Sequence, residues 1–151
     1  MRWIRMLMLL TLLAGSACNG ETPTAKIIKV LPHLLDQEGR HSLSPSLYER
    51  DAYQHFLRKN PDQCSGLRFD VQWKAKAADW PRLKLRIEVR GSKTTEPYVR
   101  EEAARRNHWY HRWSSLVLDG ESYHRLGELI AWRTTLWEGD KLLAQQRSFL
   151  W

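Results

Sequence analysis

Two stretches near the middle of the chain alternate apolar and polar residues with a period of two. In each stretch, one set of alternate side chains is aliphatic or aromatic and the other is mostly charged, which is typical of antiparallel strands with one buried face. The apolar positions are Leu67, Phe69, Val71, Trp73 and Ala75 in the first stretch and Leu83, Leu85, Ile87 and Val89 in the second. We therefore predict two half-buried strands, joined by a loop that contains Asp79-Trp80-Pro81.

Other segments add strands with short turns between them. The predicted strands are 26–31, which ends before Pro32, 113–118, which precedes a turn at 119–121, and a hairpin of 129–137 and 141–149. Residues 96–112 have a helix-forming middle between strand-like ends, and are predicted to be an irregular strand or a long loop. Five or six strands indicate a mainly β fold, an antiparallel β-sandwich. Its strand order and turn spacing resemble an immunoglobulin-like sandwich, without the Cys, Trp, Cys core of that family.

One helix is predicted near residues 47–59. Ser46 and Glu49 have the spacing of a capping box, and Asn60-Pro61 marks the end of the helix. The apolar positions recur at helical intervals in two sets, Tyr48, Ala52 and Phe56, and Tyr53 and Leu57. We expect the apolar side of this helix to cover one edge or end of the sheets, which protects an exposed strand from pairing with other chains.

The first 17 residues have the three zones of a secretory signal peptide. Arg2 and Arg5 are followed by an apolar stretch at 6–14 and by small residues up to Ala17. The apolar stretch is too short to span a bilayer as a helix, so cleavage is favoured over an uncleaved anchor. The predicted organisation is a signal peptide at 1–17, a flexible tether at 18–25 and one sandwich domain at 26–151.

The segment Leu13-Ala14-Gly15-Ser16-Ala17-Cys18 resembles the lipobox of bacterial lipoproteins. This resemblance implies that Cys18 carries lipid and anchors the chain to a membrane. Gly15 stands where a branched residue is usual, so cleavage by an ordinary signal peptidase, leaving a soluble periplasmic or secreted protein, is the alternative. Asn19 follows the cysteine instead of the Asp that in some bacteria marks inner-membrane retention. The resemblance therefore favours the outer membrane, facing the periplasm.

Only one other cysteine is present, Cys64. A lipidated Cys18 cannot form a disulfide, so Cys64 is expected to be a small buried residue with a free thiol. A disulfide between Cys18 and Cys64 is the alternative for an exported chain.

Net charge and sequence motifs limit the kinds of partner and site that we expect for this chain. Removing Arg2 and Arg5 leaves 22 basic and 17 acidic residues, a net charge of +5. The two signs are interleaved along the chain, which is typical of solvated faces and predicts no nucleic-acid partner. The pair His108 and His111 lacks further ligands at a recognisable spacing, and the other four histidines are expected at the surface. We predict neither a metal site nor a cofactor, and no nucleophile motif is present.

Seven tryptophans follow the leader, and some are expected in loops beside arginines. The predicted binding patch is Trp80, Arg105, Arg106, Trp109, Tyr110 and Arg112. Exposed aromatic rings of this kind stack on sugars or on a partner's surface. The favoured function is a non-catalytic binding or scaffolding module of the cell envelope, with an envelope protein or polysaccharide as partner. The alternatives are a carbohydrate-binding module and, with less support, a hydrolase whose acids converge from separate strands.

The anchor is directly testable. Cells that produce the chain and are fed a clickable fatty acid should label it, and Cys18→Ser should abolish the label because the acceptor thiol is gone. Gel fluorescence measures the labelling. Unchanged labelling of Cys18→Ser would contradict the lipid anchor.

Overall fold

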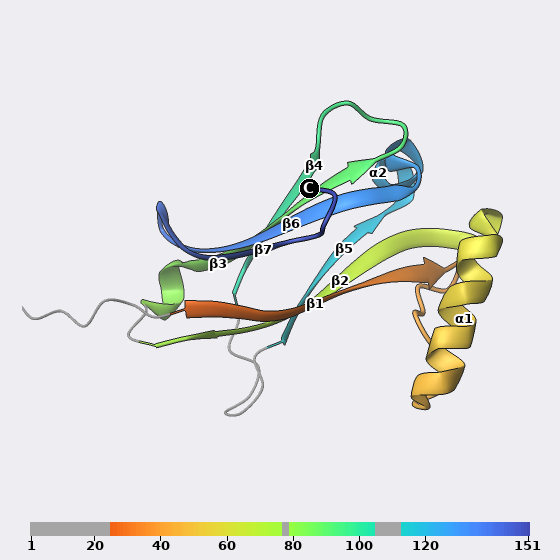
Figure 1. Ribbon diagram of the computed structural model, residues 1–151, viewed down its shortest axis with the longest axis horizontal. Helices are drawn as coiled ribbons and strands as arrows, with labels where there is room; N and C mark the ends of the chain where they lie inside the picture. The colour runs from red at the N-terminus through yellow and green to blue at the C-terminus, as the bar shows by residue number, and fades with distance from the viewer. Residues whose placement is uncertain (1–24, 77–78, 105–112) are drawn as a thin grey trace, which may run out of the picture.

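The strands form two antiparallel sheets that pack face to face (Figure 1). The computed structural model describes residues 25–76, 79–104 and 113–151. The three-stranded sheet has the order β1 (Ala25–Asp36), β2 (Cys64–Ala75), β5 (Trp113–Asp119). The four-stranded sheet has the order β4 (Tyr98–Ala103), β3 (Leu83–Gly91), β6 (Leu129–Glu138), β7 (Lys141–Arg147). Two helices, α1 (Leu47–Lys59) and α2 (Gly120–Leu126), and two 3-10 turns, Pro61–Gln63 and Trp80–Arg82, complete the mainly β fold.

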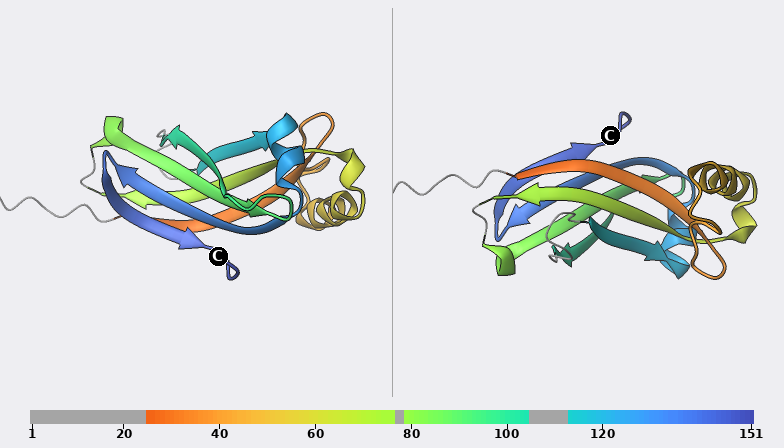
Figure 2. Two further views of the ribbon diagram at one scale, coloured as in Figure 1. Left: turned by 90° about the horizontal axis from the view of Figure 1, so that it is seen from above. Right: turned by 90° about the horizontal axis from the view of Figure 1, so that it is seen from below.

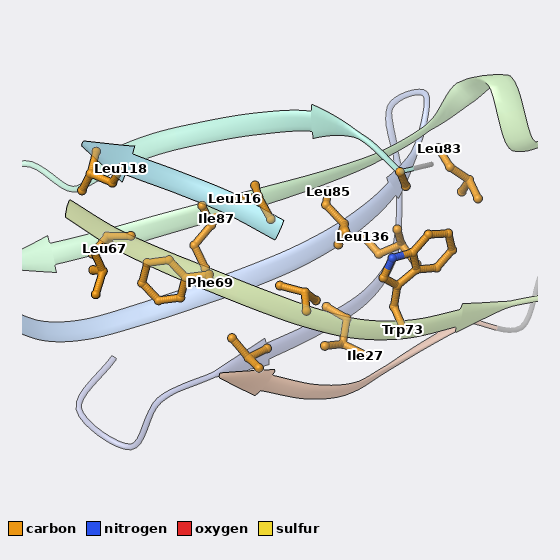
Figure 3. Close-up of a cluster of buried hydrophobic side chains, with 14 of the residues drawn as sticks. Ile27, Leu67, Phe69, Trp73, Leu83, Leu85, Ile87, Leu116, Leu118 and Leu136 are labelled. Atoms are coloured by element: carbon orange, nitrogen blue, oxygen red, sulfur yellow. The ribbon is translucent and has the colours of Figure 1, made fainter. Parts of the chain in front are cut away.

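The core lies between the two sheets and is built from their alternating faces. All nine apolar positions of the two alternating stretches are at most 3% exposed, which confirms the prediction from the period of two. Figure 3 shows Phe69 and Trp73 of β2 facing Ile87 and Leu136 of the other sheet. Because β2 and β3 are inner strands of their sheets, their apolar faces meet near the middle of the core.

Strand β1 is longer than predicted because it continues through Pro32. In the register with β2, Pro32 lies opposite Phe69 and His33 lies opposite Arg68. Proline lacks an N–H group and is tolerated in edge strands, and β1 is an edge of its sheet. The expectation that the strand ends before Pro32 was therefore wrong, and the extension carries His33 onto the sheet.

Two segments between strands also differ from expectation. Residues 98–103 form a regular strand, β4, where Arg86 of β3 lies opposite Glu101, whereas residues 105–112 lie outside the described part of the chain. The predicted turn at 119–121 begins α2 instead, and Leu126 of this helix is buried. Tyr123 of α2 packs against the core, and burial beside Cys64 raises its pKa to about 12.

Leu136 and Leu142 offer a matched test of this core. Leu136 is fully buried, so Leu136→Ala should lower the free energy of unfolding by about 2–5 kcal/mol through lost burial and a residual cavity. Leu142 on the neighbouring strand is 45% exposed, and Leu142→Ala should cost much less. Urea titrations of both variants measure the difference, and equal losses would contradict the assigned core.

Candidate functional site

Helix α1 stands across one end of the sandwich, and hydrogen bonds fix it to the edge strand β1 (Figure 1). The Gln54 side chain is only 6% exposed. Its amide oxygen accepts a hydrogen bond from the Leu34 N–H (2.8 Å), and its nitrogen donates to the Leu34 and His41 carbonyls (both 2.9 Å). The Gln54 side chain thus satisfies both the N–H and the carbonyl of Leu34. These groups have no strand partner, because β1 is an edge strand.

A second hydrogen-bonded contact ties α1 to the end of β1. The Asp36 carboxylate accepts hydrogen bonds from Tyr53 Oη (2.7 Å), Arg40 Nε (2.8 Å) and the backbone N–H groups of Arg40 (2.7 Å) and Glu38 (3.0 Å). Burial of Asp36 raises its pKa, but these hydrogen bonds and the Arg40 charge outweigh it and lower the pKa to about 2. The carboxylate therefore holds together β1, the following turn and α1.

Apolar contact also docks α1. Leu57 is the buried apolar residue of the helix, and the thiol of Cys64 lies 3.4 Å from its carbonyl oxygen. Cys64 is buried and free, as predicted, whereas Cys18 lies outside the described residues. The side of α1 that carries Tyr53, Gln54 and Leu57 is thus the side that faces the sandwich.

The other apolar set of α1 faces solvent. Tyr48 is 84% exposed and Phe56 is 42% exposed, and Ala52 between them is also exposed. Leu43, in the loop before the helix, and Leu47, at its start, are also exposed, and we name these five residues the α1 surface. The expectation that the apolar side covers the sandwich holds for Tyr53 and Leu57 and is wrong for this second set. Exposed clusters of large apolar side chains mark interaction sites more often than single exposed residues do.

The charges beside the α1 surface are segregated along the helix. Glu49 and Asp51 are exposed in its first half, and Arg58 and Lys59 are exposed in its last turn. Arg50 departs from this order, but it is partly buried and close enough to His33 to help lower the pKa of that histidine. The exposed charges of α1 therefore form an acidic half and a basic half.

A polar cluster lies on the outer face of the three-stranded sheet, close to α1. We name His33, His41, Arg68, Asp70 and Ser115 the His33 cluster. Asp70 accepts hydrogen bonds from Arg68 Nε (2.8 Å) and Ser115 Oγ (2.5 Å), and His33 Nε2 lies 3.8 Å from its second oxygen. The rings of His33 and His41 are 5.1 Å apart. Burial lowers the pKa of both histidines, and nearby arginines lower it further.

The hydrogen bonds of the His33 cluster differ from those of a serine nucleophile with its base. Such a pair needs the serine hydroxyl bonded to a histidine that takes its proton. Here the Ser115 hydroxyl donates to Asp70 and accepts from Arg68 Nη2 (3.0 Å), while His33 lies on the other side of the carboxylate. The cluster links β1, β2 and β5 across the sheet, and this arrangement stabilises the sheet instead of activating Ser115.

The outer face of the four-stranded sheet carries a second charged network. The buried carboxylate of Glu88 accepts from Arg133 Nη2 (2.5 Å) and forms an ion pair with Arg86 Nε (3.1 Å). Trp151 lies over Arg133 and Arg90, whose guanidinium carbons are 4.9 and 4.4 Å from its ring centre. Strand β7 ends at Arg147, so the prediction that it reaches residue 149 was wrong. The chain turns and places its terminal ring on this network.

The His33 cluster is not visible in the sequence pattern, because the predicted first strand ends before Pro32. His33 and His41 were expected to be separate surface residues, but the extended strand brings their rings together. Because edge strands tolerate proline, the first strand could have been extended through Pro32. That extension would have placed His33 beside the polar face of β2.

Most of the predicted binding patch lies outside the described residues. Trp80 is described and is partly buried, with its ring centre 5.9 Å from that of Trp73 at the edge of the core. The residues that the structure does not describe are Arg105, Arg106, Trp109, Tyr110 and Arg112, together with His108 and His111. The patch stays a prediction, and the role visible for Trp80 is packing.

Metal-binding groups and hollows are two other kinds of candidate site in the described ranges. Within them, no group of three or more His, Cys, Asp or Glu side chains is placed to hold a metal ion. A shallow hollow of about 220 Å³ lies where the turn after β3 meets α2, and its lining includes Glu96, Tyr98 and Arg125. This volume is below the usual range of small-molecule sites.

Comparisons with protein families, with curated proteins and with solved structures find no match to this chain. Among residues 25–76, 79–104 and 113–151, no helix is long and apolar enough to cross a membrane. The α1 surface and its charged flanks are the candidate functional site that the described side chains define.

The low pKa of Asp36 predicts a specific acid sensitivity. A carboxyl whose folded-state pKa is below its unfolded value stabilises the fold above about pH 4, and this contribution is lost as the pH falls towards 2. Between these limits, the wild type should lose about 2 kcal/mol more unfolding free energy than Asp36→Asn, which cannot titrate at this position. Urea titrations across this pH range measure both slopes, and parallel slopes would contradict the assignment.

Proposed function

We propose that this chain is an exported, lipid-anchored module of the cell envelope that binds a partner through the α1 surface and does not catalyse a reaction. The observation that carries this proposal is that α1 leaves a second set of apolar side chains exposed. Hydrogen bonds from Gln54 and Tyr53 dock the helix, while Tyr48 is left in solvent and Phe56, whose ring stacks on that of Tyr53, is 42% exposed. Aromatic side chains are enriched at protein interfaces, where they supply contact area at low entropic cost.

An immunoglobulin-like sandwich is part of the proposal. In the constant type of that fold, strands 1, 2, 5 and 4 form one sheet and strands 3, 6 and 7 form the other. Here the fourth strand pairs with the third, and the other six keep their sheets. This single exchange supports an immunoglobulin-like architecture. Sandwiches of this kind bind partners through the elements at their ends, and α1 lies at such an end.

The position of the first strand favours a partner away from the anchoring membrane. Strand β1 begins at Ala25 at the end opposite α1 (Figures 1 and 2). A lipid on Cys18, followed by the tether at 18–25, would attach the membrane to that end, which supports presentation of α1 towards the periplasm. An envelope protein then fits the α1 surface better than the lipid bilayer does.

The His33 cluster gives catalysis less support than the α1 surface gives binding. Ser115 donates its proton towards Asp70, so a reaction through Ser115 would first require His33 to replace that carboxylate.

Photocrosslinking tests the binding proposal in cells. The full chain with p-benzoylphenylalanine in place of Tyr48 should form a covalent adduct of higher mass on irradiation, because this side chain would face the bound partner. Phe149 is a matched control, since it is a fully exposed aromatic residue outside the α1 surface. Immunoblots measure the adducts. Absence of an adduct at position 48, or equal yields at positions 48 and 149, would contradict the proposal.

A further inference from the structure

We infer that the partner of the α1 surface is α1 of a second copy of this chain, and that the two helices pair in antiparallel orientation. This inference rests on the proposed function, because it names the occupant of the same surface. It makes the envelope module a symmetric dimer, in which one surface of each copy meets the identical surface of the other.

The distribution of charge along α1 is the first support. In an antiparallel pair with its axis at Ala52, Arg58 of one copy lies about one helical turn beyond Glu49 of the other, within reach of an ion pair between these long side chains. Two-fold symmetry forms this favourable contact twice. A parallel pair would instead place like charges side by side, so the charges favour the antiparallel direction.

The apolar positions fit the same symmetry. Tyr48 and Phe56 lie four residues before and after Ala52, on one face of the helix. With the two-fold axis at Ala52, Tyr48 of each copy meets Phe56 of the other, and the two alanines meet at the axis. Aromatic rings pair favourably in offset or edge-to-face contacts. A small residue at the crossing point lets the two helices approach closely enough to make them.

The other occupants fit this surface less well. A membrane with anionic lipids attracts basic helices, but Glu49 and Asp51 would face the same headgroups as Arg58 and Lys59. An unrelated protein would need its own charges arranged to match both halves of α1. A second copy carries the matching arrangement on the same helix.

Disulfide trapping tests the contact at the proposed axis. The full chain with Ala52→Cys, produced in a bacterial host and treated with a mild oxidant, should give a disulfide-linked dimer, because position 52 would meet itself. The wild type gives the background from Cys18 and Cys64. Ala103→Cys is the matched control, since Ala103 is an exposed alanine on β4 away from α1. Equal dimer yields for Ala52→Cys and Ala103→Cys would overturn the inference.

Charge reversal tests the direction of pairing with variants at exposed positions. Either Glu49→Lys with Asp51→Lys, or Arg58→Glu with Lys59→Glu, gives α1 exposed charges of a single sign. In the Ala52→Cys background each pair should lower the self-linked yield by about tenfold. Coexpression of the two oppositely charged variants, with different epitope tags, should restore a mixed dimer. A misfolded variant could not be rescued in this way, and failure of the mixed dimer would overturn antiparallel pairing.

The mass of the photocrosslinked adduct separates the two proposals. An adduct at position 48 with twice the mass of the chain supports both. An adduct with a foreign protein, or a chain that crosslinks only to lipid, overturns self-pairing. An adduct with a foreign protein agrees with the binding function. An adduct with lipid, or the absence of any adduct, contradicts both proposals.

Discussion

Packing of β2 against β3 across the sandwich is the interaction on which the other elements depend. Each is an inner strand of its sheet, and each contributes an alternating row of buried side chains, among them Phe69 and Trp73 from β2 and Ile87 from β3. The remaining strands pair with these two or with their neighbours, and α2 places Leu126 beside the same core. Loss of this contact would leave both sheets with an apolar face in water, where neither is stable alone.

A second constraint is that polar groups at the edges and outer faces of the sheets need hydrogen-bond partners. Strand β1 is an edge with unpaired backbone groups, and Gln54 satisfies those of Leu34 while Tyr53 bonds Asp36. These hydrogen bonds, together with the burial of Leu57, place one side of α1 against the sandwich. Tyr48 and Phe56 lie outside that side and are exposed.

The proposed binding role depends on which elements lie at the two ends of the molecule. The first strand starts at one end and α1 covers the other, so a tether before Ala25 and a partner on α1 would act at opposite ends of the same rigid sandwich. The charged networks at Asp70 and Glu88 lie on the outer faces between these ends. Their members are bonded to one another and so link neighbouring strands of each sheet.

The sequence determined the elements whose signal is local. The period of two placed Leu67 to Ala75 and Leu83 to Val89 in the core, and helical intervals placed α1 at 47–59, because burial on one face leaves a pattern in consecutive residues. Only the tertiary structure decided that β1 continues through Pro32, that His33 meets Asp70, and which apolar set of α1 is buried. Those outcomes depend on strand order and on hydrogen-bond partners far away in the chain, which no local pattern records.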